Sequence, residues 1–221
     1  MSSSSPAPDH DAATSPDGPV APPAGITDGR LARQVAFLVE IDRLKSVLRQ
    51  SHLIDLSRRE NDAEHSWHLA MLAVVLGEYA AAEVDQARVI RMLLIHDLVE
   101  VYAGDTFLYD VEAAADQEER ERAAADRLFP QLPADQAVPL RAMWDEFEAR
   151  RTPDAQFARA LDRVQPLLLN FHTRGRSWRA HRVTRADVLA HQEVIASGSR
   201  ALWEYIRIMI DEAVRRGYLL P

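Results

Sequence analysis

Apolar residues recur every three or four positions along most of the chain, which is the spacing of amphipathic helices. The first such stripe predicts a helix that runs to about Arg49. Its apolar positions are Leu31, Val35, Leu38, Ile41, Leu44 and Leu48. Because the spacing is sustained over several turns, we expect this segment to begin the folded part of the chain.

Two further apolar segments predict helices in the first half of the chain. One covers about residues 62–79, with Asp62 as the cap of its first turn. The next, over residues 89–98, is strongly apolar and carries His96 and Asp97 near its end. This third helix is therefore expected to be central to the fold.

The second half of the chain continues the helical pattern. Helices are predicted at about residues 112–128, 136–151, 157–169, 184–197 and 199–216, with a loop at 175–183. No segment shows the sustained alternation and hairpin turns of strands. The predicted fold class is all-α, a single helical bundle.

Residues 1–29 differ in composition from the rest. They hold half of the 12 prolines, a run of serines, and no Lys or Arg. Such a segment cannot bury enough apolar surface to order itself. We predict a disordered tail over 1–29 and one domain over 30–221.

Composition excludes several classes of protein. At 221 residues and 47% hydrophobic, the chain can bury one core without disulfides, and with no cysteine any metal must be held by His and carboxylates. The net charge of −8 argues against nucleic acid as the partner. No apolar run is long enough to cross a membrane. A cytoplasmic location and a small phosphorylated substrate fit these limits.

His96 and Asp97 form the most informative pair in the sequence. They place an imidazole and a carboxylate at the polar end of an otherwise apolar helix, where an unpaired buried carboxylate is costly. A divalent cation would compensate that cost. The alternative is a His-Asp pair at a helix end exposed to solvent.

Two more residues of the same chemistry lie in helical context. His65 stands near the start of the second predicted helix, and Asp162 lies within an apolar one. An Asp among core residues needs a partner, and the alternative to a metal is a neighbouring arginine, Arg159 or Arg163.

The order of these residues resembles the HD superfamily of metal-dependent phosphohydrolases. His65 is followed about thirty residues later by His96-Asp97, and Asp162 follows about sixty-five residues after that. The segments around them are similar to the 5′-deoxynucleotidase branch. These segments are Glu60-Asn61-Asp62-Ala63-Glu64-His65-Ser66, Ile95-His96-Asp97-Leu98-Val99-Glu100 and Ala103-Gly104-Asp105. The resemblance spans about residues 31–170.

The resemblance implies a metal site and its chemistry. His65, His96, Asp97 and Asp162 would bind one divalent transition metal, either Co, Mn, Zn, Fe or Ni, and Asp97 would also count among the catalytic residues. Glu100, which follows His96 by four positions and so shares its helix face, would be the acid/base residue. The alternative for Glu100 is a solvated glutamate at a helix end.

Substrate contacts are implied for two further residues. Arg49 corresponds to an arginine near the end of the first helix that binds phosphate in the family. The aromatic residue that usually follows it is missing from Gln50-Ser51-His52, which puts stacking on the base or sugar in doubt. Asp105 resembles a residue close to the substrate sugar, and the alternative for it is an Asx turn or a helix cap.

The remaining histidines separate this chain from dinuclear members of the superfamily. No histidine lies between Asp97 and Asp162, where those members carry additional ones, so a mononuclear site is predicted. His68 is assigned to the core or to the surroundings of the site. The residues expected at the surface or in loops are His172, His181 and His191, and those expected to serve packing are Trp178 and Trp203.

The leading hypothesis is hydrolysis of deoxynucleoside 5′-monophosphates to deoxynucleoside and phosphate. The alternatives are an HD phosphodiesterase or nucleoside triphosphate hydrolase, a catalytically inactive regulatory module, and, less favoured, a di-iron oxygenase. A homodimer through the apolar helix at about 201–214 is left open, because packing within one chain would explain that face equally well.

Overall fold

The structure, a computed structural model, describes residues 27–221. Its α-helices are α1 (Gly29–Ile41), α2 (Asp62–Leu76), α3 (Gln86–Ile95), α4 (Glu100–Ala103), α5 (Val111–Ala114), α6 (Gln117–Leu128), α7 (Ala134–Ala149), α8 (Pro153–His172), α9 (Arg176–Ala180), α10 (Arg185–Gln192), α11 (Ile195–Gly198) and α12 (Arg200–Arg215). Short 3₁₀ turns are η1 (Asp42–Ser46), η2 (Gly77–Tyr79), η3 (His96–Val99) and η4 (Phe129–Gln131). The predicted all-α class is confirmed.

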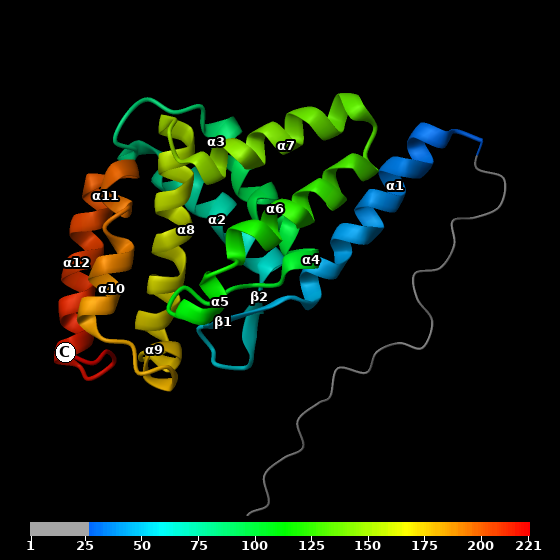
Figure 1. The fold of residues 1–221 in the computed structure, drawn as a ribbon. Helices are drawn as coiled ribbons and strands as arrows, with labels where there is room; N and C mark the ends of the chain where they lie inside the picture. The colour runs from blue at the N-terminus through cyan, green and yellow to red at the C-terminus, as the bar shows by residue number, and fades with distance from the viewer. Residues whose placement is uncertain (1–26) are drawn as a thin grey trace, which may run out of the picture.

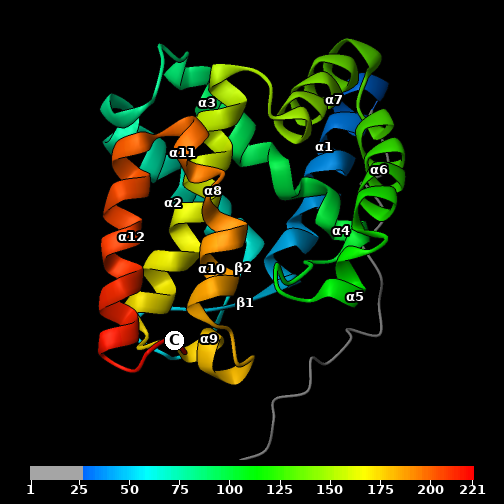
Figure 2. The ribbon, with the colours of Figure 1, turned by 60° about the vertical axis from the view of Figure 1, so that its left-hand side comes forward.

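Helix α8 is the centre of the arrangement. It packs against α2, α3, α7, α11 and α12, and Figures 1 and 2 show it enclosed by these elements. Its buried residues include Phe157, Leu161 and Val164, which join the largest hydrophobic cluster with Leu69, Met92 and Leu93 of α2 and α3. A polar residue on α8 therefore stays buried only where it has a partner.

The first predicted helix is shorter than expected, which corrects the sequence interpretation. Helix α1 ends at Ile41, and after η1 the chain extends into strand β1 (Leu48–His52). This strand pairs antiparallel with β2 (Arg59–Asn61), in an irregular register. Arg49 thus lies on a strand and not at a helix end.

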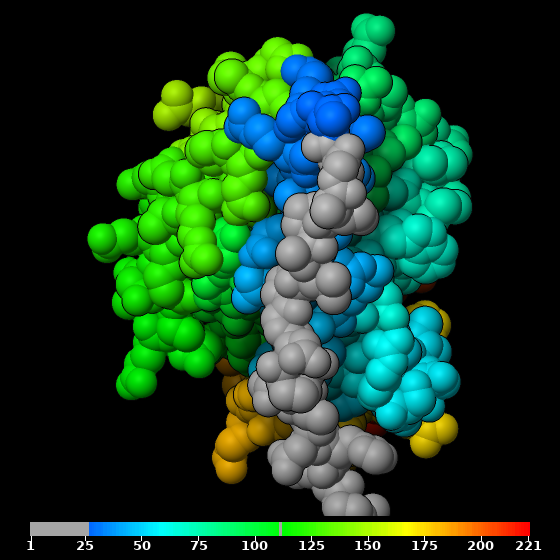
Figure 3. All heavy atoms as spheres, turned by 90° about the vertical axis from the view of Figure 1, so that its right-hand side faces the viewer, coloured from blue at the N-terminus to red at the C-terminus, as the bar shows by residue number. Residues whose placement is uncertain are grey.

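The apolar face that the sequence predicts for α1 is mostly exposed to solvent. Leu31, Val35 and Leu38 point to solvent, whereas Phe37 is buried with Leu44 of η1. Figure 3 shows α1, in blue, at the surface between the green α6 and α7 and the teal helices. Its buried contact is narrower than the sequence pattern indicated.

Several predicted boundaries also move. Helix α2 ends at Leu76, because the chain tightens into η2 at Gly77. The cap of α2 is Asn61, whose side chain accepts from the Glu64 amide in a capping box, so Asp62 is free for another contact.

Other segments are divided into shorter helices. Residues 112–128 form α5 and α6, residues 184–197 form α10 and α11, and the predicted loop at 175–183 contains α9. Trp178 of α9 is buried, as expected for a packing residue. The predicted tail lies outside the described residues up to position 26, and its last two residues, Asp28 and Gly29, cap and begin α1.

None of the described helices combines the length and the apolar character that crossing a membrane requires.

Candidate metal centre

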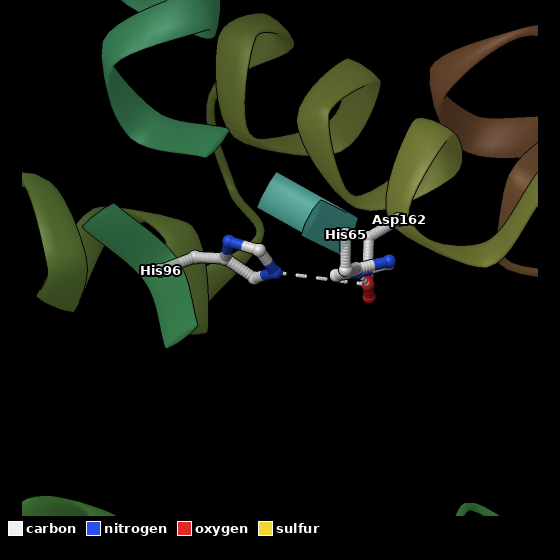
Figure 4. Close-up of side chains that lie close together, drawn as sticks. All are labelled: His65, His96 and Asp162. Carbon is white, nitrogen blue, oxygen red and sulfur yellow. Dashed lines mark hydrogen bonds and ion pairs between the residues drawn. The ribbon is translucent and has the colours of Figure 1, made fainter. Parts of the chain in front are cut away.

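Three of the predicted ligands converge from three elements. His65 comes from α2, His96 from η3 and Asp162 from α8, and their ligand atoms lie within 4.8 Å of one another. Figure 4 shows the His96 imidazole pointing toward the His65 and Asp162 side chains. All three residues are buried.

Asp97 borders this group. Its Oδ1 lies 3.0 Å from His96 Nε2, and its Oδ2 lies 3.8 Å from His65 Nε2. Helix α3 stops at Ile95, and His96 and Asp97 are the first two residues of the 3₁₀ turn η3, where both side chains are buried. The predicted third helix therefore ends one turn early, and its last residues form the site.

Hydrogen bonds on the outer ring nitrogens orient both histidines. His65 Nδ1 lies 3.0 Å from Gln165 Oε1, and His96 Nδ1 lies 2.8 Å from the Leu93 carbonyl. Both partners are acceptors, so each Nδ1 donates and each Nε2 presents a lone pair to the cluster.

That orientation fits a metal ion. His65 Nε2 lies 3.1 Å from Asp162 Oδ1, so in the neutral state a lone pair would face a carboxylate oxygen. His96 Nε2 is buried, and although Asp97 Oδ1 lies 3.0 Å away, this nitrogen makes no hydrogen bond to any of the described residues. Two imidazole nitrogens and carboxylate oxygens form the donor set that divalent transition metals accept. A cation bound between these nitrogen and oxygen atoms would give each of them a partner.

The electrostatics of the cluster lead to the same conclusion. Burial alone would lower the pKa of His96, but Asp97 and Asp162 outweigh it and raise that pKa to about 10. Burial opposes ionisation of Asp97 as well, yet His96 and Arg49 lower its pKa to about 2. The site thus attracts positive charge strongly, whether from protons or from a metal.

Gln165 is a site residue that the sequence interpretation missed. Besides holding His65, its amide donates to Glu60 Oε1 at 2.7 Å and lies 3.2 Å from His68 Nδ1. His68 is half-buried and contacts Gln165, in agreement with its assigned place in the surroundings of the site. The signal available in the sequence was an amide side chain within an apolar helix. The structure shows that this side chain is wholly buried, and buried polar groups normally have hydrogen-bond partners.

A second acidic group surrounds Arg49. Arg49 Nη1 donates to Asp62 Oδ1 and Asp97 Oδ2, each at 2.9 Å, and lies 3.6 Å from Asp105 Oδ1. Asp62, expected only to cap a helix, is wholly buried in this contact. Strand β1 therefore delivers Arg49 directly against the predicted ligand Asp97.

Glu100 and Asp105 lie on the same side as Arg49. Burial first, then Asp97 and Asp62, raise the pKa of Glu100 well above its usual range. Burial raises the pKa of Asp105 to about 6, although Arg49 opposes it. The N-cap of α5 is Asp110, so Asp105 is not needed as the cap of the next helix.

A cavity of about 650 Å³ opens onto this group. The residues that line it include His96, Asp97, Asp162 and Glu100, together with Arg49 and Asp105. Its volume is in the range of small-molecule sites. His191 lines the rim and is exposed, as are His172 and His181, in agreement with their predicted surface positions.

Comparisons with known proteins agree with this geometry. The family model described as HD domain matches residues 41–203. The bovine 5′-deoxynucleotidase HDDC2 is 28% identical over 150 residues, which cover 67% of this chain and 72% of the relative. The human protein of the same name is 27% identical over 133 residues, covering 60% and 64%.

Solved structures extend the likeness. A crystal structure described as a predicted metal-dependent phosphohydrolase from Magnetospirillum magnetotacticum is 60% identical, with a TM-score of 0.83, covering 87% of this chain and 96% of that one. A conserved hypothetical protein from Pyrococcus furiosus, 19% identical with a TM-score of 0.56, covers 82% and 99% and shares the fold. The chain is a member of the HD domain family of metal-dependent phosphohydrolases.

Proposed function

We propose that the protein hydrolyses deoxynucleoside 5′-monophosphates to the deoxynucleoside and inorganic phosphate. The observation that carries the proposal is one cavity in which the His-Asp cluster, Glu100, Arg49 and Asp105 meet. The bovine and human relatives are named as 5′-deoxynucleotidases, which supports this substrate class.

His65, His96, Asp97 and Asp162 would hold one divalent transition metal. A metal bound there lowers the pKa of coordinated water and polarises a phosphoryl oxygen. Asp97 has a double role, since its Oδ2 also holds Arg49 at 2.9 Å and so ties the metal cluster to the proposed phosphate contact.

Glu100 is proposed to move the proton. Water attacks phosphorus, the bond from phosphorus to the 5′-oxygen breaks, and the leaving nucleoside oxygen takes a proton from the Glu100 carboxyl. The protons of the water stay at first on the phosphate product, and one of them then returns to the Glu100 carboxylate. The buried position of Glu100 on the cavity wall beside the cluster supports this role.

Arg49 and Asp105 are proposed to contact substrate. The Arg49 guanidinium lines the cavity next to Asp97, so its remaining N–H groups can donate to phosphate oxygens. Asp105 lies 3.6 Å from Arg49, close enough for one ligand to reach both. A carboxylate there would accept a hydrogen bond from the sugar 3′-hydroxyl and crowd a 2′-hydroxyl.

The test is phosphate release from a panel of deoxy and ribo 5′-monophosphates. Metal-stripped protein would be resupplied with Co, Mn, Zn, Fe or Ni, and with Mg for comparison. We expect metal-dependent release that favours deoxy substrates, and a loss of about 10²- to 10⁴-fold in kcat for Glu100→Gln while one metal stays bound. Cleavage of no monophosphate with any metal would overturn the proposal in favour of a phosphodiesterase, an oxygenase or a regulatory role.

Asp105→Asn tests the sugar contact, with Asp116→Asn as control. Asp116 is a solvent-exposed aspartate that pairs with Arg120. We expect the deoxy preference to fall in the first variant and to stay unchanged in the second. An unchanged preference in Asp105→Asn would remove this role from Asp105.

A small phosphorylated nucleotide is thus the proposed partner. The cytoplasmic location, the homodimer and the absence of nucleic-acid binding stay predictions from the sequence.

A further inference from the structure

One face of α8 lines the cavity along most of its length. Arg159, Asp162, Arg163 and Asn170 are all on it, at the helical spacing of three, four and seven residues. The two arginines thus flank the proposed metal ligand Asp162. Arg150, the residue after α7, lines the same cavity. We refer to Arg150, Arg159 and Arg163 as the arginine cluster.

The two helical arginines share one carboxylate oxygen. Arg159 Nη1 donates to Asp162 Oδ2 at 3.1 Å, and Arg163 Nε lies 4.0 Å from the same atom. The other oxygen of Asp162 faces His65 and His96. Asp162 therefore compensates one guanidinium well and the second only at a distance.

Burial makes the surplus charge significant. The Arg159 and Arg163 side chains are 13% and 17% exposed. The Nε atoms of both are buried without a hydrogen-bond partner among the described residues. Buried donors to this extent are normally satisfied, and a planar guanidinium suits the oxygens of a phosphate.

A metal bound to Asp162 would add to the excess of positive charge around this carboxylate. The cation and both guanidiniums would then share the same carboxylate, which carries a single negative charge. Two other carboxylates of the cavity already pair with an arginine, Glu148 with Arg150 at 3.6 Å and Asp97 with Arg49. An anion between the metal and α8 would offset this excess of positive charge.

We infer that the arginine cluster, with Arg163 as its main contact, binds the phosphoryl group of the substrate from the α8 side of the metal, opposite Arg49. This inference rests on the proposed phosphomonoester hydrolysis. Arg49 approaches the cluster next to Asp97, whereas Arg159 and Arg163 approach it next to Asp162. A dianionic phosphate between these sides neutralises charge from both.

The test measures binding of inorganic phosphate to the Mn-loaded full chain by titration calorimetry. Arg163→Gln removes the charge and is expected to weaken binding about 10- to 100-fold, the effect of a lost charged hydrogen bond. Arg163→Lys keeps the charge without the planar fork and should recover part of the loss. Arg91→Gln, at an exposed position on α3 outside the cavity, is the control and should bind like the wild type.

A second variant keeps the inference testable if the Arg163→Gln protein does not fold. Arg150 has a φ of 55°, a conformation that glycine adopts without strain, so Arg150→Gly is expected to fold at least as well. We expect it to weaken phosphate binding several-fold. Wild-type affinity in both Arg163→Gln and Arg150→Gly, with one metal bound, would overturn the inference.

The outcome separates this inference from the proposed function. Phosphate binding that depends on Arg163 supports the inference even if no monophosphate is cleaved. Steady-state kinetics should show the Arg163→Gln effect mainly in KM for a deoxynucleoside monophosphate. If Arg163→Gln impairs only a di- or triphosphate substrate, the cluster contacts a more distant phosphate and the inference is wrong.

Discussion

At the scale of single residues, the histidines of the site depend on groups that never touch the metal position. His65 is oriented by Gln165 and His96 by the Leu93 carbonyl. The first of these contacts can be removed by mutation, because it comes from a side chain. Gln165 in turn is held by Glu60.

We expect Gln165→Leu to weaken metal binding by about 10- to 100-fold, because His65 loses the acceptor that fixes its tautomer. The measurement is competition with a chelator of known affinity. Gln156→Leu, on the same helix but outside the cavity, is the matched control and should leave the affinity unchanged. Equal affinities in the two variants would show that Gln165 does not support the site.

The predicted ligands could be found from the sequence because each is a polar residue in an apolar context. Asp162 lies among the buried apolar residues of α8, and the His96-Asp97 pair directly follows those of α3. Asp62 and Arg49 could not be placed in the same way. Their contact depends on a strand and a capping box that position residues 13 apart in sequence side by side.

At the scale of elements, α8 is held at a fixed distance from α11 by a glycine. A Cβ at Gly198 would lie 2.2 Å from the Gln156 carbonyl oxygen and 2.7 Å from Ala160 Cβ. The two helices can approach this closely only because the side chain is absent. Asp162 is on the same helix, so this packing also positions the site.

Gly198→Ala is expected to destabilise the fold by about 1–3 kcal/mol, since the helices must separate to admit the methyl group. Urea unfolding measures the change. Gly29→Ala is the control, because a Cβ there meets nothing within 4 Å. A Gly198→Ala protein as stable as the Gly29→Ala protein would contradict this account of the contact.

Helix positions were predictable from the sequence to within a few residues, but the segment after α1 was not. Its apolar positions continue to Leu48, yet the chain leaves the helix at Ile41 and β1 begins. Pairing with the polar residues of β2, and the contacts of Arg49 with buried carboxylates, decide that segment. Neither the strand pairing nor these contacts changes the spacing of apolar residues, so the sequence pattern does not show them.

At the scale of the whole molecule, the proposed metal joins α2, η3 and α8. Only the folded chain brings these ligands together, so metal binding adds to the free energy of unfolding. The family could be recognised from the order of these residues in the sequence, and the four proposed ligand positions follow from that resemblance. The cavity and the arginine cluster required the packing of α7 and α8 against the rest.

Metal removal is therefore expected to lower the unfolding temperature. With metal at a hundredfold excess over its Kd, the gain in stability is about 2.7 kcal/mol. For a chain of this size that corresponds to roughly 5–10 °C. Differential scanning calorimetry of stripped and reloaded protein measures it. Asp162→Ala should show no shift on adding metal, and an equal shift in that variant would place the metal elsewhere.

The central claim is that one metal, held by His65, His96, Asp97 and Asp162, supports phosphate release. The most direct test is to titrate metal into stripped protein and to record bound metal and phosphate release from a deoxynucleoside 5′-monophosphate together. The account predicts that activity rises in proportion to bound metal and stops rising at one ion per chain. Activity in the stripped protein, or a rise that continues to two ions per chain, would contradict it.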